Sequence, residues 1–365
     1  MTGSEELMKI ESVRGWNESV GLTRPYSIAG RRIEAVSLFY VEVVTEDDVG
    51  IGSASPSESV TGESAAACGD ALAVAADVLR GEDVTRIGRL QQLLETHLGE
   101  TPAARAAIDM ALWDVFAKGL GVPVVDLWGA RRDEPIATSI TVGIQSVEQA
   151  MADAEEYLQR GFRCLKIKIG DDFAADMERL GALRALADET AGEGQVAIRV
   201  DGNHGFDLEE LRRLADGAHR LGVELVEQPV PPAADDELCA LPDDTRALLA
   251  ADESLVEERH AVGLLRGMPY RHWNLKLMKH GGPTPARAIA HLAHTAGLGL
   301  MWGCMDESVA SIAAALHAAY ASPATERLDL DGSFDLADDR AVGGFRLENG
   351  RLHLLDEPGL GVAWA

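Results

Sequence analysis

The sequence predicts an α/β protein whose larger part is a closed barrel of alternating strands and helices, preceded by a smaller α+β module. From residue 131 onward, eight apolar strand-like runs alternate with seven amphipathic helical stretches, which is typical of parallel strands joined by crossover helices. Eight such units over about 200 residues suit a closed barrel better than an open sheet. No GxGxxG or GxxxxGKS/T phosphate loop, which an open doubly wound sheet often carries, is present.

The first 130 residues are expected to form the α+β module. Residues 8–54 are rich in strand formers and contain an Asp-rich turn, which predicts a hairpin or meander. One well-marked helix should have Thr101 as its N-cap and Pro102 in its first turn, and should end at Gly119 or Gly121. Apolar spacings of three and four predict two further helices, at 65–80 and 86–97.

The expected barrel strands are spaced by about one βα unit, and nearly all of them end in charged or amide residues. The carboxyl ends of barrel strands meet in one mouth, where barrel active sites lie, so residues far apart in the sequence can share one pocket. The expected strands are 136–142, 164–169, 196–200, 224–226, 247–251, 273–277, 298–302 and 327–330.

The charge balance excludes several kinds of partner. With 33 basic and 60 acidic residues the chain has a net charge of −27, so we expect no nucleic acid and no anionic membrane surface as partners. The acidity is spread along the chain, as on a strongly hydrated surface, and would suit a high-salt habitat. No apolar run is long enough to span a membrane, and no secretory leader is recognised. The four cysteines are scattered without a CxxC pair, which predicts buried reduced thiols and a cytoplasmic protein.

Three carboxylates end consecutive expected strands. Asp201, Glu227 and Asp252 would converge at the mouth and repel one another unless a cation neutralises them. Ligands that are all oxygen select a hard divalent ion, and we expect Mg²⁺, one ion per subunit. No His or Cys occupies these strand ends with zinc spacing. The alternative is that some of the three only form salt bridges within the barrel.

Lysine is scarce in this chain, since only six of the 33 basic residues are lysine. Lys166 and Lys168 are two residues apart on one expected strand and share a face, while Lys276 ends a strand about halfway around the ring. Burial and nearby cations would depress the pKa of such lysines toward neutrality, so that they can act as general bases. Two opposed bases suggest proton removal from one face of a carbon and return on the other. The alternative is that the lysines only neutralise the carboxylates, and Lys279 is expected to be a supporting partner.

At these positions the chain resembles the enolase superfamily, in its muconate-lactonising branch. The resemblance covers nearly the whole chain. It implies a (β/α)7β TIM-like barrel at 131–339 and an N-terminal α+β capping domain at 1–130, to which residues 340–365 return. The residues that carry it are Lys166-Ile167-Lys168, Asp201, Glu227, Asp252, and Lys276 within residues 274–282.

The resemblance also implies roles for these residues. Lys168 and Lys276 would be the acid/base pair, and Lys166 would assist electrostatically. The three carboxylates would bind Mg²⁺, which stabilises the enediolate formed when a carbon next to a carboxylate loses its proton. A mandelate-racemase-type enzyme would place a His–Asp pair where Lys276 stands, so that branch is disfavoured.

Asp329 and Asp331 select among the reactions of this branch. Alternation along a strand puts both aspartates on one face at the mouth, where they would attract a cation. Similar paired aspartates bind the substrate's α-ammonium in dipeptide epimerases, so the resemblance implies that role here. The alternative is a plain turn, since Asp-Gly is turn-prone. An EF-hand is excluded because Arg340 would stand where the bidentate Glu is needed.

The preference for a substrate side chain depends on residues around the mouth. Asp306 and Glu58 would suit a Lys or Arg side chain, and the resemblance is closest to dipeptide epimerases that prefer cationic residues. Arg24 could instead pair with an acidic side chain, as in Ala-Glu epimerases. Thr141, which ends the first barrel strand, is either a hydroxyl contact for the substrate or a structural residue.

The sequence therefore predicts an isomerase, a Mg²⁺-dependent dipeptide epimerase. It would invert the α-carbon of the second residue of an L,L-dipeptide by two-base 1,1-proton transfer. The alternatives on the same scaffold are an N-acylamino acid racemase and an o-succinylbenzoate synthase. A non-catalytic metal-binding barrel is an alternative of a different class, but it would not need opposed lysines. We expect a homo-oligomer.

Overall fold

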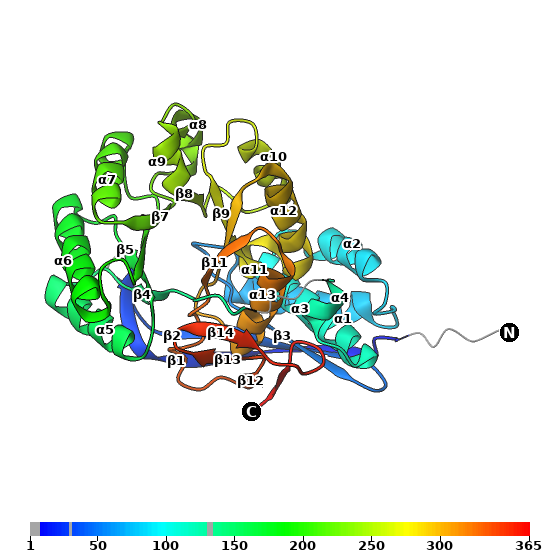
Figure 1. The fold of residues 1–365 in the computed structure, drawn as a ribbon. Helices are drawn as coiled ribbons and strands as arrows, with labels where there is room; N and C mark the ends of the chain where they lie inside the picture. The colour runs from blue at the N-terminus through cyan, green and yellow to red at the C-terminus, as the bar shows by residue number, and fades with distance from the viewer. Residues whose placement is uncertain (1–7, 29–30, 130–133) are drawn as a thin grey trace.

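A parallel barrel with an antiparallel sheet beside it makes up most of the protein (Figure 1). The computed structural model describes residues 8–28, 31–129 and 134–365. The barrel sheet has the order β11-β10-β9-β8-β7-β6-β5-β4, so each strand pairs with its neighbours in the chain. A parallel bridge between Thr138 and Leu328 joins the first strand segment to the last. The predicted (β/α)7β barrel is confirmed.

Strands and helices alternate through the barrel as predicted, with the helices outside the strands (Figure 1). The strands are β4 (Ile140–Val142), β5 (Cys164–Lys168), β6 (Ala197–Asp201), β7 (Val223–Glu227), β8 (Leu249–Ala251), β9 (His272–Lys276), β10 (Gly299–Gly303) and β11 (Thr325–Asp329). The helices are α5 (Val147–Gln159), α6 (Phe173–Ala191), α7 (Leu208–Arg220), η1 (Pro232–Ala234), α8 (Asp235–Leu238), α9 (Asp243–Leu248), α10 (Glu258–Leu264), α11 (Leu277–His280), α12 (Pro283–Ala296) and α13 (Val309–Ala321).

Two barrel strands are shorter than the sequence predicts. The first begins at Ile140, because the residues just before it form only isolated bridges to other segments. The fifth begins at Leu249, because Leu248 still belongs to α9. Apolar content alone does not distinguish a strand from the buried end of the helix that precedes it.

The predicted meander is confirmed in the N-terminal module. Strands β1 (Ser12–Ile28), β2 (Arg31–Val44) and β3 (Val49–Ala54) form an antiparallel sheet in chain order. One face of the sheet is covered by helices. These are α1 (Ala65–Leu79), α2 (Ile87–Leu98) and α3 (Pro102–Leu120), followed by the short α4 (Val124–Leu127).

Helix α3 lies on β3 at unusually close range. A Cβ atom at Gly52 would stand 2.0 Å from the carbonyl oxygen of Ala107, so only glycine fits there. The predicted start at Pro102 is correct, but the Thr101 hydroxyl donates to Leu98 instead of capping the helix. The helix ends at Gly121, which has φ of 69° and forms a left-handed C-cap.

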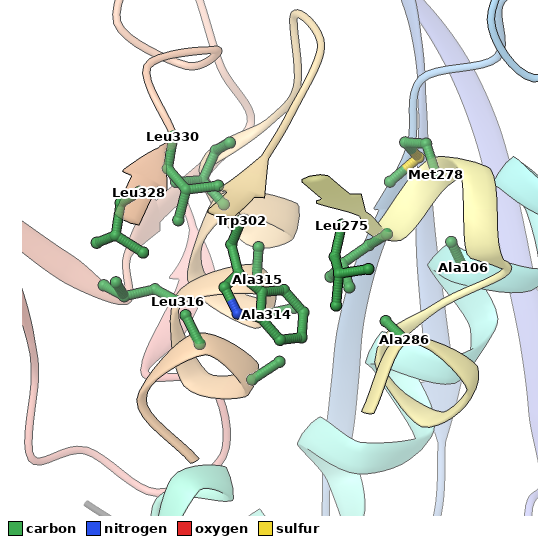
Figure 2. Close-up of a cluster of buried hydrophobic side chains, with 14 of the residues drawn as sticks. Ala106, Leu275, Met278, Ala286, Trp302, Ala314, Ala315, Leu316, Leu328 and Leu330 are labelled. Carbon is green, nitrogen blue, oxygen red and sulfur yellow. The ribbon is translucent and has the colours of Figure 1, made fainter. Parts of the chain in front are cut away.

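The main core lies between the strands and the helices that cover them. Figure 2 shows Trp302 of β10 against Ala314 and Ala315 of α13, with Leu275 of β9 nearby. The indole nitrogen of Trp302, although buried, donates to the Thr325 hydroxyl at 2.9 Å. These apolar side chains alternate along the strands with the polar ones of the mouth, so one strand serves both the core and the site.

The C-terminal residues pack against the N-terminal sheet. Strand β12 (Ala341–Gly343) pairs with β15 (Val362–Trp364), and β13 (Phe345–Glu348) pairs with β14 (Arg351–Leu354). The Trp364 ring centroid is 5.2 Å from that of Trp16, and its indole nitrogen donates to Glu42. The domain limits stay a prediction, and the boundary at residues 130 and 131 lies outside the described residues.

Two further expectations concern the burial of the cysteines and the absence of membrane-spanning segments. All four cysteines are free, but only Cys68 and Cys164 are buried, so the prediction of burial is wrong for Cys239 and Cys304. Among the described residues, no helix is both long and apolar enough to cross a membrane.

Candidate active site

Charged side chains meet at the carboxyl ends of the barrel strands. Four of them end strands, one lies in the middle of β5, and one follows β8 directly. All six are nearly inaccessible to solvent, although charged residues are rarely buried unless they are paired. They are Lys166 on β5, Asp201 on β6, Glu227 on β7, Asp252 after β8, Lys276 on β9 and Asp329 on β11.

Lys166 joins three of the carboxylates. Its Nζ lies 3.1 Å from Asp201 Oδ2, 2.8 Å from Glu227 Oε2 and 2.8 Å from Asp329 Oδ2. Burial alone would lower the pKa of Lys166, but the charges of Asp201, Asp329 and Glu227 outweigh it and raise the pKa well above the usual value. Lys166 is therefore a fixed positive charge in this arrangement.

Asp252 is held by two lysines. Lys276 Nζ lies 2.7 Å from Asp252 Oδ2, and Lys279 Nζ donates to the Asp252 backbone oxygen at 2.7 Å and also to the carboxylate. Burial lowers the pKa of Lys276, but Asp252 and Glu227 raise it more. The predicted depression of this pKa is therefore wrong for Lys276 in this charge arrangement. The reason is that its nearest charged groups are carboxylates, which favour the ammonium form.

Lys168 is placed differently from Lys166. It lies on the same face of β5, one step nearer the mouth, and is half-buried. Burial raises the pKa of Asp306, and the charge of Lys168 opposes this rise; the same charge helps to lower the pKa of Asp201, so Lys168 stands near both carboxylates. In the described part of the chain, no hydrogen bond or ion pair holds its Nζ. A half-buried amine without a fixed partner is suited to exchanging a proton with a bound molecule.

The three carboxylates predicted to bind metal come from adjacent strands, but their oxygens do not yet surround one point. Among the described residues, no three Asp, Glu, His or Cys side chains are grouped closely enough to hold an ion as they stand. The ammonium groups of Lys166 and Lys276 lie against them instead. Buried carboxylates need positive charge close by, and these lysines supply it.

The donor set nevertheless fits a hard divalent cation. Burial, and then the charge of Asp201, raise the pKa of Glu227 to about 8, because the negative charge here is only partly compensated. Asn274 Nδ2 donates to Glu227 Oε1 at 2.7 Å and so orients this carboxylate. All three candidate ligands offer carboxylate oxygen, the donor that Mg²⁺ prefers.

The two aspartates of the last strand are not equivalent. Asp329 is buried: its Oδ1 accepts a hydrogen bond from the Ser139 hydroxyl at 2.6 Å, and its Oδ2 is paired with Lys166. Asp331 is half-buried, and its Oδ2 accepts from the Thr141 backbone N–H at 2.8 Å. Burial and the neighbouring Asp329 raise the pKa of Asp331 to about 6. Asp331 also begins a turn, so the turn alternative is correct for the backbone.

The structure brings Asp306 to the mouth together with Tyr26 of β1. The Tyr26 hydroxyl donates to Asp306 Oδ2 at 2.6 Å. The Ser55 hydroxyl donates to the Asp306 backbone oxygen at 2.7 Å. Segments of the N-terminal module therefore reach the end of β10. Glu58 is exposed on the turn at residues 57–62, and no described contact ties it to the other candidate residues.

Arg24 is paired with two carboxylates of the chain. Its guanidinium is paired with Glu156 on α5 and lies 3.5 Å from Asp335. A contact of Arg24 with an acidic substrate side chain stays a prediction, and in this structure Glu156 and Asp335 are its partners. Thr141 makes its contact to Asp331 through the backbone, while its side chain is half-buried.

Two family models match the chain, one on each side of the boundary between the modules. Residues 12–129 match the N-terminal domain of the mandelate racemase and muconate lactonizing enzymes. Residues 149–365 match the enolase C-terminal domain-like family. This chain belongs to the enolase superfamily. Within it, the similarity is to the muconate-lactonizing branch, as the sequence predicted.

Superfamily members with known activities are similar over the full length of the chain. An L-Lys-D/L-Arg epimerase of Methylococcus capsulatus is 48% identical over 98% of this chain and 99% of its own. An L-Ala-D/L-Glu epimerase of Bacillus subtilis is 33% identical over 98% of each. A crystal structure of the Methylococcus capsulatus dipeptide epimerase with Mg and the dipeptide L-Arg-D-Lys matches with a TM-score of 0.94 over 98% of this chain and all of that one, at 48% identity.

Two residues of this superfamily site and one contact escaped sequence reasoning. Asn274 is two residues before Lys276, and alternation along the strand could have shown that it faces the interior. The same rule, applied back from Thr141, could have found Ser139. The contact of Tyr26 with Asp306 gave no signal in the sequence, because it depends on how the N-terminal sheet lies against the barrel.

Proposed function

We propose that this protein is a Mg²⁺-dependent dipeptide epimerase, an isomerase that inverts the α-carbon of the second residue of an L,L-dipeptide and prefers Lys and Arg side chains. The observation that carries the proposal is the 48% identity, over nearly the whole chain, to an L-Lys-D/L-Arg epimerase. The 33% identity to an L-Ala-D/L-Glu epimerase is clearly lower. The acidic mouth of the barrel supports a cationic substrate.

Asp201, Glu227 and Asp252 would hold one Mg²⁺ per subunit. When bound, the ion supplies positive charge that stabilises the negative charge developing on the substrate's carboxylate. For the three carboxylates to take this role, Lys166 and Lys276 have to give up some of their present contacts with them. Lys279 and Asn274 then keep Asp252 and Glu227 in place.

Lys168 and Lys276 would exchange the α-proton on opposite faces of the substrate. One lysine removes the proton, and the other returns one from the other side, which inverts the carbon. They come from β5 and β9, four strands apart in a ring of eight, and this placement supports attack from two sides. Lys166, with its raised pKa, stays protonated and contributes positive charge to the mouth.

The substrate's ammonium group would bind the pair of aspartates at the end of β11. Asp331 is the more accessible of the two, while Asp329 holds Lys166 at the same time. Asp306 would take a cationic side chain, since Tyr26 occupies only its Oδ2. Contacts of Thr141 and Glu58 with the substrate stay predictions, as do a homo-oligomeric state and a cytoplasmic location, which the free thiols support.

Solvent deuterium exchange tests the proposal directly. The protein is incubated with Mg²⁺ and D₂O together with L-Arg-L-Lys, L-Ala-L-Glu or an N-succinyl amino acid, and the gain of one mass unit is measured. Exchange into L-Arg-L-Lys, and slower exchange into L-Ala-L-Glu, is the expected result. Exchange only into N-succinyl amino acids would contradict this proposal and indicate an N-acylamino acid racemase instead.

A further inference from the structure

Two carboxylates compensate the positive charge of Arg24 beside the barrel mouth. Arg24 Nη2 is paired with Glu156 on α5, and Nε lies 3.5 Å from Asp335, in the segment after β11. A third group is Tyr157, whose ring centroid lies 5.1 Å from the guanidinium carbon. The three charged side chains are each between one third and one half exposed, so the pairs are accessible to solvent and to a bound molecule.

Arg24 is close to the residues proposed for substrate binding. Burial raises the pKa of Tyr157 to about 12, and the charges of both Arg24 and Asp331 act on this hydroxyl. Two residues along β1 from Arg24, the Tyr26 hydroxyl donates to Asp306. The backbone N–H of Thr23 donates to Asp335 at 2.8 Å, which fastens this part of β1 to the segment after β11.

We propose that Glu156 and Asp335 are specificity-determining residues that act through Arg24, by neutralising it so that no positive charge at the mouth is available to an acidic substrate side chain. This inference rests on the proposed function. A free guanidinium binds a carboxylate strongly, through two parallel hydrogen bonds. Glu156 and Asp335 are both ion-paired with Arg24, and Glu156 also lies 3.5 Å from Arg160 on the same helix. Arg24 therefore adds little net charge to the mouth, which also holds Asp306 and Asp331.

The test removes both carboxylates without changing their size. In the variant Glu156→Gln with Asp335→Asn, the ratio of kcat/KM for L-Ala-L-Glu to kcat/KM for L-Ala-L-Lys should rise about ten-fold, which corresponds to about 1.4 kcal/mol. Adding Arg24→Gln to this variant should return the ratio to the wild-type value, because the freed charge is then absent. The gain should shrink at high salt, since these charges are half-exposed.

Two controls make the result decisive. The rate with L-Ala-L-Ala, whose side chains are uncharged, and the melting temperature report whether the variants are folded. The single variant Glu156→Gln should raise the ratio of kcat/KM values by less, about three-fold. If the folded double variant keeps the wild-type ratio of kcat/KM values, or if the rise in this ratio persists after Arg24→Gln, this inference is overturned. The proposed function would still stand. If the wild-type protein exchanges deuterium into none of the dipeptides, both the proposed function and this inference are overturned.

Discussion

The Ser139 hydroxyl donates a 2.6 Å hydrogen bond to Asp329, whose other oxygen lies 2.8 Å from Nζ of Lys166. Ser139 is fully buried, and its backbone N–H donates to Leu328 where the barrel closes. One serine thus joins the first and last strand segments and also orients the carboxylate that holds Lys166.

Replacement of Ser139 by Ala should therefore lower kcat. Asp329 would keep a buried oxygen without a partner, which costs about 1–3 kcal/mol, and one of the three carboxylates that hold Lys166 would lose its fixed orientation. We expect a fall in kcat of about ten-fold with a smaller change in KM, measured on L-Arg-L-Lys. Ser322→Ala is the matched control, because the Ser322 hydroxyl is buried and has no hydrogen-bond partner among the described residues. Equal kcat values in the two variants would contradict this prediction.

Asp201→Asn should weaken Mg²⁺ binding at least ten-fold. The change removes one anionic ligand from the proposed set of three and leaves the shape of the side chain nearly unchanged. Calorimetric titration with MgCl₂ measures the affinity independently of activity. Asp216→Asn, an exposed position on α7, should bind Mg²⁺ as the wild type does. The metal assignment fails if both variants bind the ion equally.

The two proposed bases should be separable by stereochemistry. Lys168→Ala should stop exchange of the α-proton from one epimer of the dipeptide and spare exchange from the other, and Lys276→Ala should do the reverse. Proton NMR in D₂O, starting from each pure epimer, measures both rates. Lys9→Ala, at an exposed position, should leave both exchange rates unchanged. Loss of exchange from both epimers to the same extent in each lysine variant would argue against two bases.

Asp109 should make stability depend on pH. This buried carboxylate on α3 accepts hydrogen bonds from the backbone N–H and the hydroxyl of Thr284, at the start of α12. Burial outweighs these bonds and raises the pKa of Asp109 to about 7. The folded state therefore binds the proton more tightly than the unfolded state, in which the pKa is about 3.9. Its contribution to stability is complete below about pH 4 and is lost as the pH rises through about 7.

The variant Asp109→Asn isolates this contribution. Its free energy of unfolding, measured by urea titration at several pH values, should fall less between pH 4 and pH 8 than that of the wild type. Parallel curves for the two proteins would show that Asp109 ionises normally. Such a result would mean that the hydrogen bonds from Thr284 outweigh burial.

Two glycine substitutions should have opposite effects on stability. Gly52→Ala would put Cβ 2.0 Å from a backbone oxygen of α3, so the helix and β3 must separate, and we expect a loss of about 3 kcal/mol or more. Gly88 lies in helix α2 with open space around it, and Gly88→Ala should stabilise the protein by about 0.5–1 kcal/mol. Thermal unfolding measures both, and a stable Gly52→Ala variant would contradict the close packing.

The sequence is informative about the barrel because its strands repeat a local pattern. Each strand end can be located from apolar runs, and alternation then assigns a face to Lys166, Asp201, Glu227 and Lys276 without any long-range knowledge. The partners of these side chains could not be predicted in this way. Which ammonium pairs with which carboxylate depends on distances across the mouth, so the pKa of Lys276 was predicted in the wrong direction.

Contacts between distant segments were the least predictable part. Arg24 and Glu156 are 132 residues apart, and Tyr26 and Asp306 are 280 apart. Neither pair has a periodic signal, because each depends on how a strand of one module lies against the other. The interpretation of Arg24 as a partner for an acidic substrate side chain rested on its charge alone and did not include Glu156 and Asp335, its partners in the structure.

The position of Trp364 has a consequence for the order in which the chain is made. The face of β1 and β2 that carries Trp16 and Tyr40 is synthesised before the barrel, but the aromatic ring that covers it belongs to Trp364, 322 residues after Glu42 of β2. At about 5–20 residues per second, this sheet waits with an uncovered aromatic face for tens of seconds. A product that ends before Trp364 would leave this apolar face exposed and would be prone to capture by chaperones and proteases.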